Sequence, residues 1–505
     1  MKPSSIADER PFAVLDVGSN SARMIVFKLR EGEHLDVVED ARAPLRLARE
    51  LGAGDTLGQE AIDRTLEVLR DFRAIADGAG ADRILAVATS AVRDASDGAE
   101  LITRARAEGV PLQTIDGETE ARLGFIGAVH DLPVTSGAVL DVGGGSAEVS
   151  RFLDRRLEQS WSFPLGSLRV SDRFLRDDPP KEGQLRSLRR SVAESLEEGK
   201  VPELGRGEDL VGIGGTIRNL AKMDLSRSDH PLQLLHGYEL AEEHLEAMVE
   251  RMAGLSMKRR ARLGGLNPDR VDSILGGAIV IDEIMRTLGA RAIVVSSRGV
   301  REGLALGGEE AALPPPAWVR TMSIATLAAR FATWDPKGAD RRATVAARLQ
   351  EALDPEAGDA VREMLTHAAT VLDVGRAIDY YDRFEHAAMI VTSADLGGFT
   401  HEGIGMLSAI LRQADDDLRL GPYRRLVRDA DRPAVLRAAT VLALADELKR
   451  RIPAPEPAVI AGTWHPSAFV IEGPLPHGWH PRALADRFRR VFDRPLHVMS
   501  TLDHP

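Results

Sequence analysis

Two segments of the chain repeat one short pattern, and this repeat constrains the fold more than any other feature. Residues 14–21 read VLDVGSNS and residues 139–146 read VLDVGGGS. Each is a short apolar run, which predicts a buried strand, followed by an Asp and a turn of Gly and Ser. Backbone N–H groups of such a turn approach an anion closely, and the carboxylate of Asp16 or Asp141 can hold a hydrated Mg²⁺ beside a phosphate. The repeat therefore predicts two similar halves that face one cleft.

Length and composition set the limits of this interpretation. The chain has 505 residues, too many for one hydrophobic core, and at roughly 150 residues per domain we expect three or four domains. Its apolar content of 44% and charged content of 28% are typical of a soluble globular protein. No segment has the length of a membrane span and the first ten residues lack an apolar h-region, so we expect a cytoplasmic protein with no membrane partner. The absence of Cys excludes disulfides, thiol catalysis and zinc sites built from Cys.

The net charge of −12 argues against a nucleic-acid partner. A polyanionic substrate would need a local basic track instead. The candidates are two short clusters, Arg424-Arg425 with Arg428 and Lys449-Arg450-Arg451. The alternative interpretation is that both clusters are solvated helix faces.

The hydrophobic pattern divides the chain into an α/β part and a helical part. Before residue 308, strand-like runs alternate with helical stretches, which predicts parallel sheets with crossover helices. Three consecutive prolines, Pro314–Pro316, cannot continue a helix or a central strand, so they mark the main boundary. Beyond them, helical periodicity predicts an all-α domain, and residues 455–505 predict a small α+β unit.

Two further segments carry residues suited to phosphate chemistry. Glu120 lies in the first turn of a helix that we expect to start at Gly117, where the helix dipole favours a carboxylate and should keep it ionised. An ionised carboxylate beside a bound phosphate can act as the general base that deprotonates a water molecule. Arg93 follows the strand-like run 84–88 and has the fork of donors that grips a phosphate. A well-capped helix with no catalytic role is the alternative for Glu120.

In combination and order, these motifs resemble those of the exopolyphosphatase/guanosine pentaphosphate phosphatase (Ppx/GppA) family. The matching segments, all within the first 308 residues, are 16–21, 89–93, 117–122, 141–148, 214–217 and 298–303. The resemblance implies an α/β two-lobed actin-like fold, with two ribonuclease-H-like lobes and the substrate phosphates between them. An all-α HD-like domain and a small C-terminal α+β segment follow. The predicted boundaries are 1–130 for lobe I, 131–308 for lobe II, 309–318 for a linker, 319–454 for the HD-like domain and 455–505 for the C-terminal segment.

The resemblance also implies roles for single residues, matched by position. Glu120 corresponds to the catalytic base of the family. Asp141 and Glu148 match acidic residues that serve the metal and the attacking water, and Asp16 matches the acidic residue of the first phosphate turn. Arg93 resembles the phosphate-binding arginine and is grouped with the catalytic residues. The remaining substrate-binding residues implied are Ser19, Asn20, Gly144, Gly145, Ser146, Gly215 and Thr216.

The function implied is processive hydrolysis of the terminal phosphate of inorganic polyphosphate, which releases orthophosphate. Mg²⁺ is the expected cofactor, with another divalent metal or a monovalent cation left open, and a homodimer is the expected assembly. The alternative is removal of the 5′-phosphate of guanosine pentaphosphate, with guanosine tetraphosphate as a possible regulator. More distant alternatives are an actin-fold small-molecule kinase, which the Gly-x-x-Glu-Ala-Arg segment disfavours, and a nucleotide-dependent scaffold, which Glu120 and Arg93 disfavour.

The helical part resembles the HD phosphohydrolases less closely. Leu372 stands where their His-Asp segment has its His, before Asp373, and His386 and Asp446 lie in places suited to other residues of that pattern. A divalent metal site without its central imidazole is disfavoured. We expect a structural domain that closes over the cleft and guides a long chain. A second metal-dependent hydrolase centre is the alternative.

Overall fold

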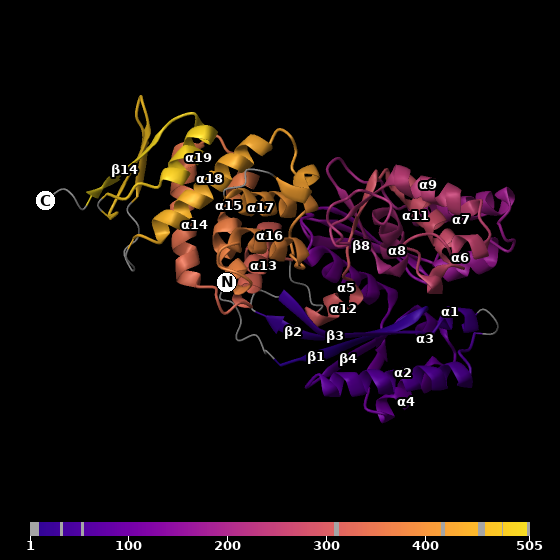
Figure 1. The fold of residues 1–505 in the computed structure, drawn as a ribbon. Coiled ribbons are helices and arrows are strands. Elements are labelled where there is room, and N and C mark those ends of the chain that lie inside the picture. The colour runs from indigo at the N-terminus through magenta and orange to yellow at the C-terminus, as the bar shows by residue number, and fades with distance from the viewer. Residues whose placement is uncertain are drawn as a thin grey trace. The chain divides into compact units, whose positions relative to one another are not determined.

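The computed structural model describes residues 10–30, 34–51, 55–307, 313–415, 420–452, 460–476 and 478–501. Two compact units make up the chain, drawn in Figure 1. The first unit extends to Val319 except for residues 230–233, which join the second unit together with the chain from Arg320. Residues 309–312 of the expected linker and the start of the expected C-terminal segment, 455–459, lie outside the described residues.

Two mixed sheets form the framework of the first unit. The first sheet has the order β3-β2-β1-β4-β5 and the second has the order β10-β11-β9-β6-β7-β8. Their strands are β1 (Phe12–Val17), β2 (Ser21–Arg30), β3 (His34–Pro44), β4 (Ile84–Ala88), β5 (Leu112–Thr114), β6 (Gly137–Val142), β7 (Ala147–Leu153), β8 (Arg156–Phe163), β9 (Asp209–Ile213), β10 (Glu239–Ala241) and β11 (Ala292–Val295). The two repeated motifs end β1 and β6, and each of these strands pairs antiparallel with the next strand and parallel with β4 or β9. The predicted two-lobed α/β fold class is confirmed.

Helices cover both faces of these sheets. In chain order they are α1 (Leu47–Glu50), α2 (Gln59–Gly78), α3 (Ser90–Asp94), α4 (Gly98–Ala107), α5 (Gly117–His130), α6 (Ser167–Phe174), α7 (Glu182–Gly199), α8 (Gly214–Leu225), α9 (Glu242–Ala253), α10 (Met257–Arg260), the 3₁₀ turn η3 (Pro268–Arg270), α11 (Ile274–Leu288) and α12 (Val300–Ala305). Strands buried on both faces read as continuous apolar runs, which explains why β1 and β6 lack polar alternation.

The two-residue period of β1 decides where Asp16 points. Leu15 and Val17 belong to the core on one face of the first sheet, together with buried residues of α2 and α4. Phe12 and Val14 belong to the core on the other face, which includes Ala305 of α12. Because side chains alternate along a strand, Asp16 shares the α12 face with Phe12 and Val14.

The same argument places Asp141 in the second sheet. Leu140 and Val142 lie in the large core beneath α8 and α11. Val139 lies in a separate core with Phe125 of α5. Asp141 therefore shares the α5 face with Val139, so both repeated Asp residues face the pair of helices α5 and α12.

Helices α5 and α12 are packed against each other, as Figure 1 shows near its centre. Two glycines allow this contact. A Cβ atom at Gly127 would lie 1.9 Å from the carbonyl oxygen of Gly299, and one at Gly303 would lie 2.0 Å from that of Leu123. Only glycine lets the two backbones approach this closely. Although α12 follows the second sheet in sequence, it packs on β1 of the first sheet.

The second unit is helical and ends in a small sheet with one helix. Its helices are α13 (Pro316–Ala329), α14 (Pro336–Leu353), α15 (Asp359–Val371), α16 (Arg383–Ser393), α17 (His401–Gln413), α18 (Arg432–Lys449) and α19 (Arg482–Phe492), with 3₁₀ segments η4 (Leu372–Ala377) and η5 (Gly421–Leu426). The sheet has the order β12-β13-β14, with strands β12 (Ala461–Trp464), β13 (Phe469–Gly473) and β14 (Leu496–Ser500). The expected all-α region and small α+β segment are both present.

A guanidinium group lies between the two acidic residues that sequence reasoning placed in an HD-like pattern. Arg342 of α14 is fully buried, with 0% exposure. It donates from Nε to Asp446 Oδ1 at 2.8 Å and from Nη2 to Asp373. Arg383 Nη2 donates to Asp446 Oδ2 at 2.9 Å. Within the described residues, no group of three or more His, Asp or Glu side chains is arranged to hold a metal ion, here or elsewhere.

Most arginines of the two basic clusters have acidic partners within the second unit. Arg428 pairs with Asp431 at 2.7 Å, and Arg450 pairs with Glu447 at 2.8 Å. Arg451 also pairs with Glu447 and lies 4.3 Å above the ring of Trp479. These arginines lie just after η5 and just after α18, so they are surface positions with local ion pairs and not helix faces.

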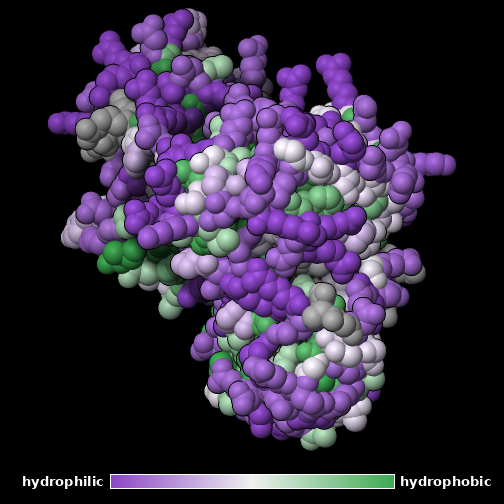
Figure 2. Space-filling model, turned by 90° about the vertical axis from the view of Figure 1, so that its right-hand side faces the viewer, coloured by the Kyte–Doolittle hydropathy of each residue, from purple (hydrophilic) through white to green (hydrophobic). Residues whose placement is uncertain are grey.

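On the face shown in Figure 2, hydrophilic residues predominate and hydrophobic ones gather only in small groups. Among the described helices, none has the length and hydropathy needed to cross a bilayer.

Replacing Arg342 by Met should destabilise the second unit strongly. Removal of one partner of a buried ion pair leaves uncompensated carboxylates, which costs about 3–5 kcal/mol. Urea unfolding of the full chain measures the change. The exposed Arg348 lies on the same helix, and Arg348→Met should stay within about 0.5 kcal/mol of the wild type.

The pH dependence of this difference tests its electrostatic origin. Burial would raise the pKa of Asp446, but Arg342 and Arg383 lower it below its ordinary value. A carboxylate with a depressed folded pKa stabilises the fold above its unfolded pKa, about 3.9, and loses that contribution as the pH falls. The gap in unfolding free energy between wild type and Arg342→Met should therefore shrink below about pH 4. A gap that stays constant from pH 7 to pH 3 would assign the effect to packing.

Candidate active site

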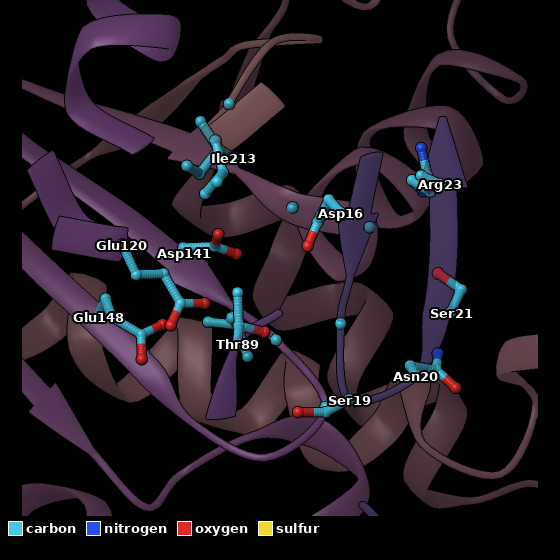
Figure 3. A pocket seen from close by; sticks show the side chains of 18 of the residues that line it. Asp16, Ser19, Asn20, Ser21, Arg23, Thr89, Glu120, Asp141, Glu148 and Ile213 are labelled. Carbon is cyan, nitrogen blue, oxygen red and sulfur yellow. The ribbon is translucent and has the colours of Figure 1, made fainter. Parts of the chain in front are cut away.

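Both repeated motifs line one pocket of about 130 Å³ in the first unit. The N-terminal turns of α5 and α8 and the loop before α12 complete its wall. The predicted site residues that line it are Asp16, Ser19, Asn20, Glu120, Asp141, Gly144, Ser146, Glu148 and Gly215. Figure 3 shows several of them around the cavity. Three predicted residues do not line the pocket: Arg93, Gly145 and Thr216.

The two Gly/Ser turns are closed in the same way. Gly18 N–H donates to Ser21 O at 3.1 Å, and Gly143 N–H donates to Ser146 O at 3.0 Å. Between these residues, the backbone N–H groups at positions 19, 20, 144 and 145 have no acceptor among the residues that the structure describes. Consecutive N–H groups of this kind form a concavity that binds anions.

Gly145 and Thr216 support the pocket from behind. A Cβ atom at Gly145 would lie 3.2 Å from Ser90 Oγ and 3.3 Å from Ser19 Oγ, and these two hydroxyls are 2.7 Å apart. The small residue thus lets the turns of the two lobes meet. Thr216 Oγ1 donates to Val142 O at 3.0 Å, which fixes α8 to the end of β6.

The N-terminus of α8 opens into the pocket at two glycines. Gly214 has φ +82°, and a Cβ atom there would lie 2.2 Å from Asp141 Oδ1. At Gly215 a Cβ atom would lie 1.9 Å from an Nη atom of Arg270. Glycine is therefore required for Asp141 and Arg270 to reach their places. The first N–H groups of a helix lack internal partners, so this end of α8 also favours an anion.

Four carboxyl groups gather on one side of the pocket. In Figure 3, Glu120, Asp141 and Glu148 point toward one another, and Asp16 points toward them from the first lobe. Burial raises the pKa of Asp141 to about 6 and raises the pKa of Asp16. Burial and the charge of Asp141 raise the pKa of Glu148. Asp16 Oδ1 is buried and has no hydrogen-bond partner in the described structure.

The helix dipole is not the main influence on the pKa of Glu120. The helix begins as predicted, with Asp116 as its cap accepting from Thr119 N–H at 2.7 Å. Burial, however, together with Glu148 and Asp141, raises the pKa of Glu120 well above its ordinary value. Desolvation and like charges outweigh a helix dipole whose effect is typically 0.3–1 kcal/mol at an exposed surface.

Arg93 contacts the expected base rather than the cavity. Its Nη1 lies 3.3 Å from Glu120 Oε2 and donates to Ile115 O at 2.9 Å. This contact lowers the pKa of Glu120, but less than burial and the neighbouring carboxylates raise it. In this structure Arg93 orients Glu120.

Five arginines that sequence reasoning did not select as site residues line the pocket: Arg23, Arg218, Arg270, Arg298 and Arg301. Burial and mutual repulsion lower the pKa of Arg23 to about 9 and that of Arg218 to about 10. The pKa of Arg270 is lowered to about 10 by burial and by Arg42 and Arg23. All three remain charged at neutral pH, so the pocket holds concentrated positive charge. Arg298 and Arg301 lie inside the matching segment 298–303 and Arg218 directly follows the segment 214–217, whereas no motif marks Arg23 or Arg270.

Equivalent positions of the repeat carry opposite charges. Asp16 pairs across the strands with Arg23, and Asp141 pairs across the strands with Glu148. Both partners lie seven residues after the Asp of their motif. In Figure 3, Arg23 and Glu148 lie on opposite sides of the site. At this one pair of equivalent positions, the first lobe thus contributes a positive charge to the pocket and the second lobe a negative one.

A second, much smaller cavity of about 10 Å³ adjoins the cluster of carboxyl groups. Glu120, Asp141 and Glu148 line it together with the apolar side chains of Val139 and Ile213. A cavity of about 10–15 Å³ is the smallest that holds one water molecule, and such a water needs two to four polar partners. The three carboxyl groups provide them.

Family comparisons agree with this geometry. The Ppx/GppA phosphatase family matches residues 25–311, and Ppx/GppA phosphatase, domain III, matches residues 319–464. The chain belongs to the Ppx/GppA phosphatase family. The resemblance inferred from the motifs is thereby confirmed.

Relatives and solved structures cover about three fifths of the chain. Exopolyphosphatase 1 of Mycobacterium tuberculosis is 33% identical over 320 residues, 62% of this chain and 92% of the relative. Exopolyphosphatase 2 of the same organism is 32% identical over 312 residues, 58% of this chain and 97% of the relative. The Ppx/GppA family member of Aquifex aeolicus is 25% identical with a TM-score of 0.52, covering 59% of this chain and 96% of that structure. An exopolyphosphatase of Cytophaga hutchinsonii is 25% identical with a TM-score of 0.54, covering 60% of this chain and 99% of that structure.

These similarities establish the reaction class. The protein is a phosphoanhydride hydrolase of the Ppx/GppA type. Its pocket meets the needs of that class, since it combines anion-binding N–H groups and arginines with carboxyl groups around a water-sized cavity.

Gly303→Ala should separate α5 from α12 and displace Glu120. The added methyl group meets a backbone oxygen, so the helices must move apart, and overpacking of this kind costs about 1–3 kcal/mol. We expect lower stability in urea and a larger loss in the rate of phosphate release. Gly183→Ala is the control, because a Cβ atom at this exposed glycine of α7 meets nothing within 4 Å. Wild-type stability and turnover in Gly303→Ala would show that the contact does not position the site.

Proposed function

We propose that this enzyme removes the terminal phosphate of inorganic polyphosphate and releases orthophosphate. The observation that carries the proposal is the lining of the pocket: arginines and a cluster of carboxyl groups line it together, and the cluster adjoins a cavity the size of one water. The arginines bind a polyanion, and a water activated by the carboxyl groups attacks its end. The exopolyphosphatase names of the relatives at 32–33% identity support this substrate.

Glu120 acts as the general base in this proposal. Its raised pKa makes it a better proton acceptor once ionised, and bound cations favour the ionised form. Glu120 takes a proton from the water, the water oxygen bonds to the terminal phosphorus, and the bridging P–O bond breaks. The shortened polyphosphate leaves with the electron pair of that bond. Arg93 holds the Glu120 carboxylate in position at 3.3 Å, and Glu148 supplies a second acceptor for the water.

The turns and arginines bind the phosphates. N–H groups at positions 19, 20, 144 and 145 and the start of α8 surround the terminal phosphoryl group, whose oxygens gain charge in the transition state. Arg23, Arg218, Arg270 and Arg301 bind the phosphates that follow. These donors are fixed in place before the substrate arrives, which is what electrostatic stabilisation of the transition state requires.

The cluster of carboxyl groups fits Mg²⁺. The buried Asp16 Oδ1 lacks a partner, and the carboxyl groups raise each other's pKa, so a cation would relieve both costs. Mg²⁺ uses one or two carboxylates plus waters and substrate phosphates, so a closed cage of protein ligands is not needed. We propose that Asp16, Asp141 and Glu148 hold it, with at most two of them as direct ligands, since the three do not form a ready-made metal cage. When bound, it neutralises charge on the transferring phosphoryl group.

Glu120→Gln should preserve substrate binding and abolish most hydrolysis. The substitution is nearly isosteric and removes only the basic oxygen, and general-base assistance typically contributes 10²–10⁴-fold in rate. Orthophosphate release at saturating polyphosphate measures the loss, and polyphosphate binding to the inactive variant measures retention. Glu118→Gln, at an exposed position in the same helical turn, should keep wild-type turnover. Near wild-type turnover in Glu120→Gln would exclude it as the base.

Asp141→Asn and Asp16→Asn should weaken the binding of Mg²⁺. Each replaces an anionic oxygen with a neutral one, and loss of even an outer partner of a metal costs roughly 10–100-fold in affinity. We expect half-saturation of activity at about tenfold higher Mg²⁺ or more, and calorimetric Mg²⁺ binding weakened in parallel. Glu118→Gln again serves as the control. Unchanged titrations in both variants would contradict the proposed ligands.

The choice of substrate is tested directly. Orthophosphate release from long polyphosphate and from guanosine pentaphosphate, measured side by side with Mg²⁺, should be faster from polyphosphate. Faster release from guanosine pentaphosphate would leave the site chemistry unchanged and overturn the proposed substrate. The cytoplasmic location and the homodimer stay predictions.

A further inference from the structure

A third cavity in the first unit, separate from the two described above, is bordered by arginines that have no ion pair among the described residues. It has a volume of about 200 Å³ and shares no lining residue with the active-site pocket. Arg227 follows α8, Arg251 lies on α9 and Arg262 lies in the turn after α10; all three are exposed. Within the described residues, none of these side chains has a carboxylate partner, whereas the nearby Arg286 pairs with Glu246 at 2.6 Å. Three unpaired guanidinium groups in an acidic protein favour an anionic ligand.

The floor of this cavity is apolar and rich in methionine. Met223 of α8 and Met248 and Met252 of α9 are buried, with exposures of 3%, 4% and 0%. Figure 1 shows α8 and α9 in the same lobe. Methionine sulfur makes favourable contacts with aromatic rings, and guanidinium groups stack on them. The lining therefore fits a ring better than a bare inorganic ion.

The turn that lines this cavity leads directly to the active site. The segment from Arg262 to Arg270 begins at the cavity and ends at Arg270 in the catalytic pocket. It is fixed to α8 by Asn219, whose Nδ2 donates to Gly265 O at 2.7 Å and whose Oδ1 accepts from Asn267 N–H at 3.1 Å. A Cβ atom at Gly265 would lie 2.8 Å from the backbone of α8, so the segment lies flat on that helix. A ligand that contacts Arg262 thus contacts the chain that positions Arg270.

We propose that this cavity binds a small aromatic anion, a single ring that carries a phosphate or a carboxylate, and that its occupancy stiffens residues 262–270. Pockets for drug-sized ligands have roughly 300–1,000 Å³, so a cavity of about 200 Å³ takes a single-ring molecule. The arginines bind the head group and the methionines contact the ring. This site is separate from the proposed catalytic site and does not depend on it.

Calorimetry with the full chain tests the site, with phenyl phosphate, benzoate and inorganic phosphate as probes. We expect phenyl phosphate or benzoate to bind with one-site saturation and more tightly than inorganic phosphate; the tighter of the two identifies the head group. In the double variant Arg251→Gln/Arg262→Gln the affinity should fall about tenfold or more, since hydrogen bonds to charged groups are lost. Arg259→Gln, an exposed arginine outside the lining, should bind like the wild type.

Hydrogen exchange tests the link to the active site. Saturating ligand should slow amide exchange in peptides that cover residues 262–270 of the wild type and leave the double variant unchanged. Equal affinity in the wild type and the double variant would place the ligand elsewhere, in the catalytic pocket for example, and overturn the proposal. Absence of binding, inorganic phosphate binding as tightly as the aromatic probes, or unchanged exchange in residues 262–270 would also overturn it.

Discussion

The contact between α5 and α12 is the constraint on which the site depends. Their backbones touch at Gly127 and Gly303, and the repeated Asp residues of both sheets face this helix pair. Helix α5 places Glu120 at its first turn, and the first turn of α12 brings Arg301 into the pocket. A fixed distance between two backbones therefore sets the distance between groups that arise from different lobes. Loops alone would not hold these groups within the tolerance that catalysis requires.

Burial drives the charged groups of the pocket toward neutrality. It raises the pKa of the carboxyl groups and lowers the pKa of the arginines, because desolvation penalises the charged form of each. Repulsion between like neighbours adds to both effects. Folding thus places like charges close together in the pocket, at a cost in electrostatic free energy. A ligand of opposite charge removes this electrostatic cost when it binds, and the free energy released adds to its affinity.

Local sequence patterns predicted the elements that carry function, because these are encoded within a few residues. Apolar runs that end in Asp and a Gly/Ser turn predicted β1, β6 and the two phosphate turns, and nine of the predicted site residues line the pocket. Arg23 and Arg270 escaped prediction, because only cross-strand register and the packing of a distant segment bring them there. The raised pKa of Glu120 could not be predicted for a similar reason: the local helix dipole was visible in the sequence, whereas the burial and the three carboxyl neighbours were not. Arg342 between Asp373 and Asp446 likewise emerges only from tertiary structure.

The opposite charges at Arg23 and Glu148 have a consequence for the polyphosphate substrate proposed above. A linear polyphosphate has two identical ends, so nothing in the molecule itself distinguishes head from tail. Two identical lobes would bind such a chain equally well in two orientations, and only one of them would place the end of the chain beside the carboxyl groups that activate the water. One exchanged residue at the same place in the repeat breaks this symmetry, since phosphates are drawn toward Arg23 and repelled by Glu148. Direction along the polymer then originates in the enzyme, through a difference between two copies of one motif.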